Sequence, residues 1–431
     1  MKILDWNSLD EGGRRAVLAR PKQRTDPRLQ AAVAGIMAEV REGGWDGLCD
    51  AARRIDGAEP RLVEVAPVAA AARQSLSSDQ IAAMDIAARN IRTFHEAARP
   101  RDVDVETAPG LRVRKLWRPI DRVGLYVPGG ATPLFSTLLM LAIPARVAGV
   151  PDIVTVTPPQ ADGSLSPVIA LAAELCGLDA VWTVGGAQAV AALAFGAGPI
   201  ARVDKICGPG NAWVAEAKRR AAGAPGGVAI DMPAGPSELM VIADESADPR
   251  QVAADLLSQA EHDPAAQVLL VTASKALTAQ VVAEVEAQTP RLPRSAVARA
   301  ALGTARVILT GNIAEAVEIA NLYAPEHLSL SVADAEARVP QVRNAGAVFA
   351  GSMAAETFGD YLAGSSHVLP TDGAARAWSG VGVDSFMKAI SVQSVTAEAA
   401  RRMAPAAALL ARMEGLEAHA LAADCRLESV A

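Results

Sequence analysis

The chain has 431 residues, of which 51% are hydrophobic and 21% charged, and its formal net charge at pH 7 is −7. This composition excludes an intrinsically disordered chain, and a mild negative charge without a long basic run disfavours a nucleic-acid-binding protein. A mass of 44.5 kDa is too large for one hydrophobic core and predicts two or three domains.

The cysteines and the apolar stretches indicate a cytoplasmic protein. No two cysteines form a CxxC pair, so we expect free thiols in a reducing compartment. The opening sequence MKILDWNSLDEGG has charges where a signal peptide needs an apolar core. The most apolar stretch, 133–150, contains polar residues and a proline, which predicts a buried helix and no membrane span. The cysteines are Cys49, Cys176, Cys207 and Cys425.

The first 122 residues are predicted to be mainly helical. Residues 1–25 are expected to form an N-terminal arm. Residues 26–122 are expected to form a helical segment that packs with residues 238–380. Within this segment, apolar residues recur at helical spacing in 27–57 and in 77–98.

Residues 123–237 predict a first Rossmann-like unit. Short β-rich runs alternate there with helical runs, which is typical of a parallel sheet with helices on both faces. The predicted strands are Val123–Val127, Ile153–Thr157, Val181–Val184, Lys205–Cys207 and Val228–Ile230. The predicted helices are Pro133–Ala148, Pro167–Cys176, Ala187–Phe195 and Ala212–Ala221.

Residues 238–380 repeat the alternation and predict a second Rossmann-like unit. Its predicted strands are Leu239–Ile242, Val268–Val271, Val307–Leu309, Leu328–Ser331 and Ala347–Phe349, and its predicted helices are 249–261, 275–287, 313–322 and 333–343. Residues 381–431 are predicted to be a helical tail, which is too short to bury a core alone and is therefore expected to dock on a partner subunit. The predicted fold is α/β, with two tandem Rossmann-like parallel-sheet units and helical extensions at both ends.

Three glycine-rich turns follow predicted strands of the first unit. In such turns, backbone N–H groups and the start of the next helix can receive a phosphate. None of the turns is a GxGxxG fingerprint, but three in a row favour a dinucleotide site over ordinary loops. Cys207 could alternatively trap an aldehyde as a thiolate, although no base lies next to it in the sequence. The turns are Val127-Pro-Gly-Gly130, Val184-Gly-Gly-Ala-Gln188 and Cys207-Gly-Pro-Gly-Asn211.

The chain has only five histidines, and four of them lie near other chemically active groups. His95, the exception, lies inside the predicted helix 77–98 and is interpreted as structural. Gln259 and His262 are three residues apart at the end of a predicted helix, so they could bind one metal ion from one face. Together with Asp360 and His419, they give a nitrogen and oxygen donor set compatible with Zn²⁺. Any one of these histidines could instead be an ordinary hydrogen-bonded residue.

Glu326 and His327 place a carboxylate beside an imidazole just before a predicted strand. An imidazole titrates near neutral pH, so His327 is a candidate general base. Adjacent residues in extended backbone point apart, which would let the two groups serve different steps. The alternative is an ordinary surface pair at the junction of a loop and a strand.

Long stretches of the chain resemble the bacterial histidinol dehydrogenase family, in the same order and spacing. The resemblance extends from DWNS at Asp5 to the C-terminal helix. It is carried by VGLYVPGGATPLFSTLLMLAIPARVAGV, VGGAQAVAALAFG, VDKICGPGNAWVAEAKR, AIDMPAGPSE, DLLSQAEHDP, APEHL, GDYLAGSSHVLPT and EGLEAH.

The resemblance implies a cytoplasmic homodimer that catalyses the last step of histidine biosynthesis. Such an enzyme oxidises L-histidinol through the aldehyde to L-histidine, reduces two NAD⁺ and uses one zinc ion per subunit. By their motifs, Gln259, His262, Asp360 and His419 are the implied zinc ligands, and Glu326 and His327 the implied proton-transfer pair. The implied substrate contacts are these six residues with Ser237, His367 and Glu414, and the implied dinucleotide contacts are Tyr126, Gln188 and Asn211. The resemblance also implies that Glu414 and His419 complete the site of the other subunit.

Three other interpretations remain at the sequence level. The chain could oxidise another alcohol, such as a sulfonated or phosphorylated diol, although His367, Glu414 and His419 favour a cationic amino alcohol. A zinc hydrolase with Glu326 as its base would not need the three glycine-rich turns. A non-catalytic binding protein would explain neither the Glu326–His327 pair nor the predicted metal ligands.

Overall fold

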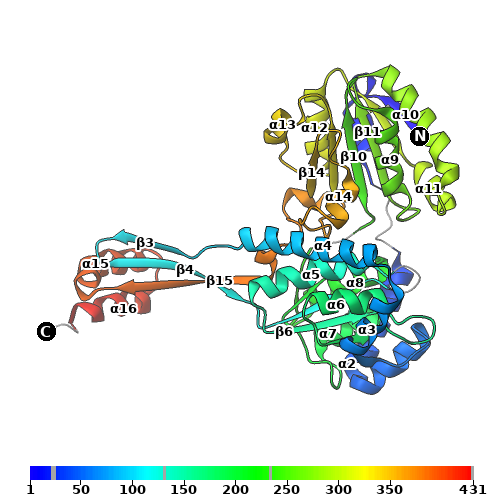
Figure 1. The fold of residues 1–431 in the computed structure, drawn as a ribbon. Helices are drawn as coiled ribbons and strands as arrows, with labels where there is room; N and C mark the ends of the chain where they lie inside the picture. The colour runs from blue at the N-terminus through cyan, green and yellow to red at the C-terminus, as the bar shows by residue number, and fades with distance from the viewer. Residues whose placement is uncertain (21–25, 130–132, 233–234, 429–431) are drawn as a thin grey trace.

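The structure, a computed structural model, describes residues 1–20, 26–129, 133–232 and 235–428. Two α/β units lie one above the other in Figure 1, and a long extension projects from the lower unit. Gly130, which belongs to the first glycine-rich turn, lies outside the described residues. No helix in the described part of the chain is long and apolar enough to cross a membrane.

The lower unit contains a six-stranded sheet in the order β2-β7-β6-β5-β8-β9. All its pairings are parallel except that of β2 with β7. Strands β5 and β8 are adjacent although two strands separate them in sequence, so the strand order reverses between them. In open α/β sheets, ligands bind beyond the carboxyl ends of the strands at such a reversal. The strands are β2 (Arg61–Glu64), β5 (Arg122–Tyr126), β6 (Asp152–Thr157), β7 (Ala180–Thr183), β8 (Lys205–Cys207) and β9 (Ala229–Ile230).

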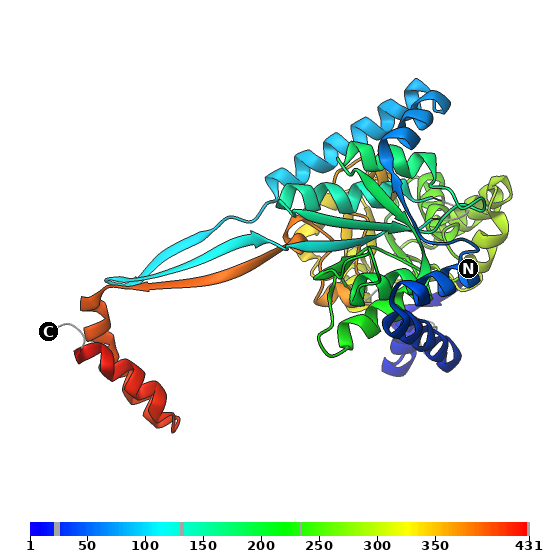
Figure 2. The same cartoon turned by 90° about the horizontal axis from the view of Figure 1, so that it is seen from below.

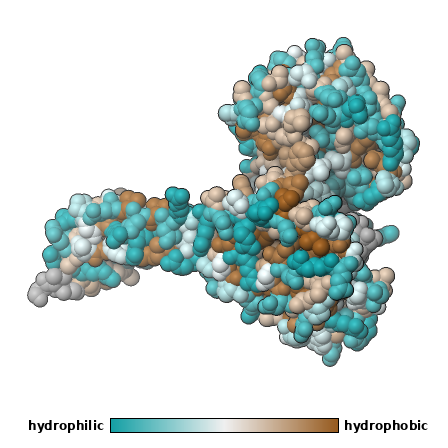
Figure 3. All heavy atoms as spheres, in the orientation of Figure 1, coloured by the Kyte–Doolittle hydropathy of each residue, from teal (hydrophilic) through white to brown (hydrophobic). Residues whose placement is uncertain are grey.

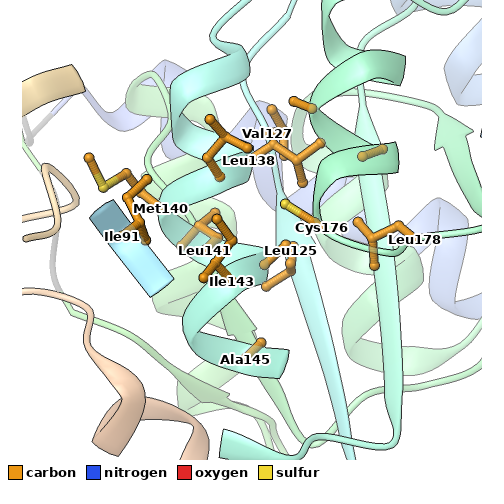
Figure 4. Packing of buried hydrophobic residues seen from close by; sticks show 14 of the residues in the cluster. Ile91, Leu125, Val127, Leu138, Met140, Leu141, Ile143, Ala145, Cys176 and Leu178 are labelled. Atoms are coloured by element: carbon orange, nitrogen blue, oxygen red, sulfur yellow. The ribbon is translucent and has the colours of Figure 1, made fainter. Parts of the chain in front are cut away.

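Helices cover both faces of this sheet, as the alternating sequence pattern predicts. Val123 and Leu125 of β5 pack into a core with α4, α5 and α6, part of which is seen in Figure 4. Tyr126 faces the opposite core, which α2, α7 and α8 complete. The helices are α2 (Pro27–Ile55), α3 (Val65–Ser75), α4 (Ser78–Ala97), α5 (Phe135–Ala148), α6 (Pro167–Leu175), α7 (Gly186–Phe195) and α8 (Ala212–Gly223).

The helical segment 26–122 packs on the lower unit, whereas the sequence analysis expected it to pack with 238–380. Helix α2 contacts α7 and α8, α3 contacts α6, and α4 contacts α5. The apolar faces of α2, α3 and α4 are therefore buried against helices of the first sheet. A hydrogen bond from Asn90 Nδ2 to the Leu362 carbonyl (2.8 Å) joins α4 to the upper unit.

The upper unit contains a fully parallel sheet in the order β1-β12-β11-β10-β13-β14. The N-terminal arm supplies its edge strand β1, which the sequence analysis did not predict. Predicted helix 333–343 is observed as the short α13 and a 3-10 turn at Val339–Gln341, because Pro340 cannot continue a helical hydrogen-bond ladder. The strands are β1 (Lys2–Asp5), β10 (Glu238–Ala243), β11 (Gln267–Thr272), β12 (Arg306–Leu309), β13 (His327–Ser331) and β14 (Ala347–Ala350). The helices are α1 (Glu11–Leu18), α9 (Pro249–Ala260), α10 (Lys275–Gln288), α11 (Ser295–Leu302), α12 (Ile313–Tyr323), α13 (Ala335–Arg338) and α14 (Glu356–Tyr361).

The extension is a three-stranded antiparallel sheet that carries two helices at its far end (Figures 1 and 2). Its strands are β3 (Val103–Ala108), β4 (Leu111–Pro119) and β15 (Met387–Val395), and its helices are α15 (Ala397–Met413) and α16 (Glu417–Glu428). The helical prediction for the start of the tail is therefore wrong over β15. Its sequence MKAISVQSV is mostly exposed, and its antiparallel pairing with β4 makes it a strand. The α/β prediction for the two main units is confirmed.

Candidate active site

The sequence-predicted residues of the two main units lie on the sides that these units turn toward each other, whereas those of the tail do not. The carboxyl ends of the first sheet's strands face this junction, and so do the amino-terminal ends of β10 and β13 in the upper unit. Thr137 Oγ1 in α5 and His367 Nε2 are 3.0 Å apart and connect the two units. The junction is therefore the place where a cofactor bound to one unit could reach a substrate bound to the other.

Glu326 and His327 are both buried at the start of β13. The backbone of Glu238, the first residue of β10, binds both side chains. Its N–H donates to Glu326 Oε2 (2.8 Å), and its carbonyl oxygen lies 3.1 Å from His327 Nδ1. A carbonyl can only accept, so His327 Nδ1 carries the proton and Nε2 is left as a bare acceptor. His327 Nε2 has no hydrogen-bond partner in the described part of the chain.

The prediction that the two side chains point apart is wrong. His327 Nδ1 and Glu326 Oε2 are 3.6 Å apart. Glu326 precedes the strand, so the alternation of side chains along a strand does not apply to it. The two groups can therefore serve one reacting centre.

Burial changes the protonation of both members of this pair. It raises the pKa of the Glu326 carboxyl well above its ordinary value and lowers the pKa of His327 to about 3. Both shifts have the same cause, because a low-dielectric environment disfavours the charged form of each group. Near neutral pH, His327 is a neutral imidazole with a free Nε2, which is the form that can accept a proton.

Three of the four predicted metal ligands lie close to this pair. Gln259 lies in the last turn of α9, His262 lies in the turn that follows the helix, and Asp360 Oδ1 in α14 is 3.9 Å from His327 Nε2. Gln259 is 1% exposed, and neither polar atom of its amide has a hydrogen-bond partner in the described residues. A buried, unsatisfied amide is costly unless a ligand completes it, so Gln259 fits a metal-binding role.

The fourth predicted ligand, His419, does not join this group within one chain. His419 lies in α16 and Glu414 at the end of α15, and both side chains are exposed. Figures 1 and 2 place these helices at the far end of the extension, well away from α14. Accordingly, the described residues of a single chain contain no cluster of three or more His, Cys, Asp or Glu side chains that could hold a metal ion.

His367 and Ser237, two of the predicted substrate contacts, lie near Glu326 and His327. His367 uses both ring nitrogens, since Nδ1 lies 2.9 Å from the Asp360 carbonyl and Nε2 lies 3.0 Å from Thr137 Oγ1. Ser237 immediately precedes β10, and its carbonyl accepts a hydrogen bond from the Gln267 N–H (2.9 Å). The hydroxyl of Thr137 thus fixes the His367 ring across the junction.

The predicted dinucleotide contacts lie at the carboxyl ends of three strands of the first sheet. Tyr126 ends β5, Gln188 lies in the first turn of α7 after β7, and Asn211 caps α8 after β8. Gln188 Nε2 donates to Asp56 Oδ2 (3.0 Å), and Gln188 Oε1 is buried without a partner in the described residues. Gln188 is completely buried in this arrangement, and Asp56 holds its amide against the turn before α7.

Cys207 does not have the environment of a nucleophile. It ends β8 and is completely buried, and burial raises the pKa of its thiol to about 12. A thiol in such surroundings is rarely a thiolate near neutral pH.

The sequence analysis missed three acidic residues that support the site. Glu238 orients the Glu326–His327 pair, and Asp56 orients Gln188. Glu356, buried in α14, places Oε1 at 3.3 Å from His327 Nδ1. The only sequence signal for Glu356 was its position four residues before Asp360, which puts both on one face of a helix.

Comparisons with known proteins show which proteins the chain resembles as a whole. A family model described as Histidinol dehydrogenase matches residues 18–427. The histidinol dehydrogenase of Xylella fastidiosa strain 9a5c is 48% identical over 431 residues, with 100% of both chains covered. The crystal structure of histidinol dehydrogenase from Elizabethkingia anophelis superposes with a TM-score of 0.95 at 39% identity, over 100% of this chain and 98% of that one. An acetylating aldehyde dehydrogenase from Geobacillus thermoglucosidasius, 16% identical with a TM-score of 0.50, covers 86% of this chain and 97% of its own length and shares the fold alone.

Proposed function

This chain belongs to the histidinol dehydrogenase family, and we propose that it oxidises L-histidinol in two NAD-linked steps to L-histidine, with one zinc ion per subunit. The observation that carries the proposal is the buried Glu326–His327 pair, whose free Nε2 faces the junction of the two units. Buried free cysteines at 49, 176 and 207 fit a cytoplasmic enzyme.

His327 is proposed to move a proton in both oxidations. Nδ1 is held by the Glu238 carbonyl, so Nε2 accepts the proton of the substrate hydroxyl. Glu326, acting in its carboxylate form with Oε2 bound by the Glu238 N–H, takes a proton from the water that adds to the aldehyde. His327 releases its first proton to solvent and then accepts the hydroxyl proton of the hydrated aldehyde in the second oxidation.

Gln259, His262 and Asp360 are proposed to hold zinc, together with His419 of the tail. The orphaned amide of Gln259 and the nitrogen and oxygen donors of the set fit this metal. When bound, zinc supplies a template for the amino alcohol and NAD⁺ supplies the hydride acceptor. Tyr126, Gln188 and Asn211 are proposed to contact the dinucleotide.

The nine residues proposed to contact the substrate come from two subunits. Ser237, Gln259, His262, Glu326, His327, Asp360 and His367 come from one chain. Because Glu414 and His419 are exposed at the end of the extension, we assign them to the site of the second chain in a homodimer. The proposed reaction involves neither a nucleic acid nor a membrane.

The stoichiometry of the reaction tests the proposal. We expect two NADH to form for each L-histidinol consumed, with L-histidine as the product identified by chromatography. A ratio of one would indicate an ordinary alcohol dehydrogenase. Turnover of a sulfonated or phosphorylated diol in preference to histidinol would contradict the assigned substrate.

A further inference from the structure

Arg20, the last described residue of the N-terminal arm, joins several backbone segments around the catalytic pair. Its guanidinium binds both carboxylate oxygens of Glu238, through Nε to Oε1 (2.5 Å) and Nη2 to Oε2 (2.8 Å). It also lies over the ring of Tyr323, with 3.8 Å from Cζ to the ring centroid. The Glu238 side chain is 2% exposed, so this is a buried, bidentate ion pair.

The same guanidinium also binds the chain just before Glu326. Arg20 Nη2 donates to the carbonyls of Tyr323 (2.9 Å) and Ala324 (3.3 Å). Ala324 ends α12 in a left-handed conformation with φ 54°, which a residue other than glycine rarely adopts. Such a conformation persists only where its surroundings hold it, and Arg20 supplies two of those contacts.

We propose that Arg20 is a positioning residue that fixes Glu326 and His327 through Glu238 and through the backbone at 323–324. This inference rests on the catalytic role proposed above for the pair. Glu238 binds Glu326 with its N–H and His327 with its carbonyl, so any displacement of Glu238 moves both groups. The N-terminal arm thereby sets the geometry of a site to which it contributes no reacting group.

The packing of the arm supports this role. Arg306 Nη1 donates to the carbonyls of Val17 and Ala19, and so holds the chain immediately before Arg20. Without Arg20, the buried Glu238 carboxylate would lose its bidentate partner and keep only the hydrogen bond that the Asp372 N–H donates to Oε1 (3.0 Å). A charge left in this state is costly, so the start of β10 would shift or Glu238 would turn away.

The test compares three variants of the zinc-loaded, full-length enzyme. Arg20→Ala removes the guanidinium, and Arg20→Lys keeps the charge but loses the bidentate geometry and the ring contact. Arg14→Ala is the matched control, since Arg14 also lies over an aromatic ring of the arm, that of Trp6 at 5.0 Å. None of the contacts described for Arg14 reaches the catalytic pair.

We expect kcat of Arg20→Ala to fall about 10²-fold, since a small misplacement of reacting groups can cost that much. The KM values for histidinol and NAD⁺ should change by less than about threefold, and Arg20→Lys should lie between Arg20→Ala and wild type. Arg14→Ala should keep wild-type kcat. The inference is overturned if Arg20→Lys matches wild type, if the loss is in KM alone, or if Arg14→Ala loses as much kcat as Arg20→Ala.

A second measurement does not depend on turnover. The chain has five histidines, so ¹⁵N-histidine labelling can resolve the His327 ring by comparison with His327→Asn. Wild type should show a proton fixed on Nδ1, and Arg20→Lys should shift that signal. An unchanged His327 signal in the Arg20 variants overturns the inference. If instead the wild-type enzyme fails to oxidise histidinol, the proposed function itself is wrong.

Discussion

Burial shifts the pKa values of Glu326 and His327 in opposite directions, because it favours the uncharged form of each group. The carboxyl keeps its proton to a higher pH than usual, while the imidazole stays neutral far below neutrality. Burial therefore disfavours the charged form of each group. Glu356 adds a third buried carboxyl whose pKa burial raises well above its usual value.

Separate replacement of the two catalytic residues should distinguish the two oxidations. Glu326→Gln should oxidise histidinol better than added histidinal, because only the aldehyde step needs an activated water. His327→Asn should lose about 10²–10⁴-fold in both steps, as expected when a general base is removed. Stopped-flow measurement of NADH from each substrate gives the comparison. Equal losses in both steps for Glu326→Gln would contradict this division of roles.

His95 should make the protein less stable in mild acid. It is 1% exposed, has no hydrogen-bond partner for either ring nitrogen in the described residues, and burial lowers its pKa from 6.5 to about 4. The unfolded chain takes up a proton near pH 6.5 and the folded chain does not, so stability is complete above pH 6.5 and declines between 6.5 and 4.

His95→Leu removes this contribution at similar volume. Thermal unfolding at pH 7.5 and pH 5 should show a smaller loss of Tm for the variant than for wild type. His327 and His367 act in the same direction, because burial lowers the pKa of each, so some acid sensitivity remains in both proteins. If the Tm of the variant and of wild type falls equally between pH 7.5 and pH 5, folding does not lower the pKa of His95.

The sequence could predict site residues that carry distinctive side-chain chemistry in a local pattern. Glu326 and His327 were found because they are adjacent, and Gln259 and His262 because of their spacing. Glu238 and Arg20 could not be found in this way. Glu238 acts through its backbone, and Arg20 reaches it across 218 positions of the chain.

At the scale of elements, the turn between β8 and α8 is held by a buried ion pair. Lys218 Nζ binds Asp231 Oδ1 and donates to the Gly208 carbonyl (2.8 Å), while the Gly208 N–H donates to Asp231 Oδ2 (2.7 Å). Gly208 has φ 129°, and a Cβ there would overlap the carbonyl oxygen of Tyr126. The turn therefore lies so close to the end of β5 that no side chain fits at position 208. Tyr126 and Asn211, two of the proposed dinucleotide contacts, lie beside it.

Gly208→Ala should therefore weaken NAD⁺ binding. The added methyl must displace the turn or the end of β5, so the KM for NAD⁺ should rise about tenfold or more. Gly223→Ala in α8 is the control, because a Cβ at that position meets no atom within 4 Å. It should leave KM unchanged and raise Tm slightly. A Gly208→Ala enzyme with wild-type KM would exclude the turn from the cofactor site.

The elements of the two main sheets were more predictable than those of the extension. Buried parallel strands form short apolar runs between helices, a pattern that the sequence displays clearly. In the extension, β3 is exposed along most of its length and β15 is exposed over most of its residues, so neither has a strong apolar signal. The pairing of β15 with β4 joins distant parts of the chain and cannot be inferred from local spacing.

At the scale of the whole molecule, the extension exposes a large apolar surface. Figure 3 shows hydrophobic residues on its outside. Leu409, Leu410 and Met413 of α15 are 61%, 62% and 75% exposed. Large apolar side chains gathered on one element indicate a protein interface. A second copy of the chain is the partner that would also explain the exposed Glu414 and His419.

Subunit mixing should show whether the tail acts in the other subunit. We expect His419→Asn and His327→Asn homodimers to be inactive, and exchange of their subunits to restore activity. A mixed dimer would have one site with both lesions and one with neither. Differently tagged chains establish how much mixed dimer has formed. Mixed dimers without activity would show that each tail serves its own subunit.

The pairing of β4 with β15 also has a consequence for biosynthesis. Residues 111–119 are made well before their partner strand at 387–395, which lies more than 260 residues further along the chain. Until then, the nascent protein carries an unpaired β4 edge, which is a site for wrong strand pairing. The helices that follow β15 emerge later still. The proposed exchange of tails between two chains would therefore have to wait until β15 and the helices after it have been made in both chains.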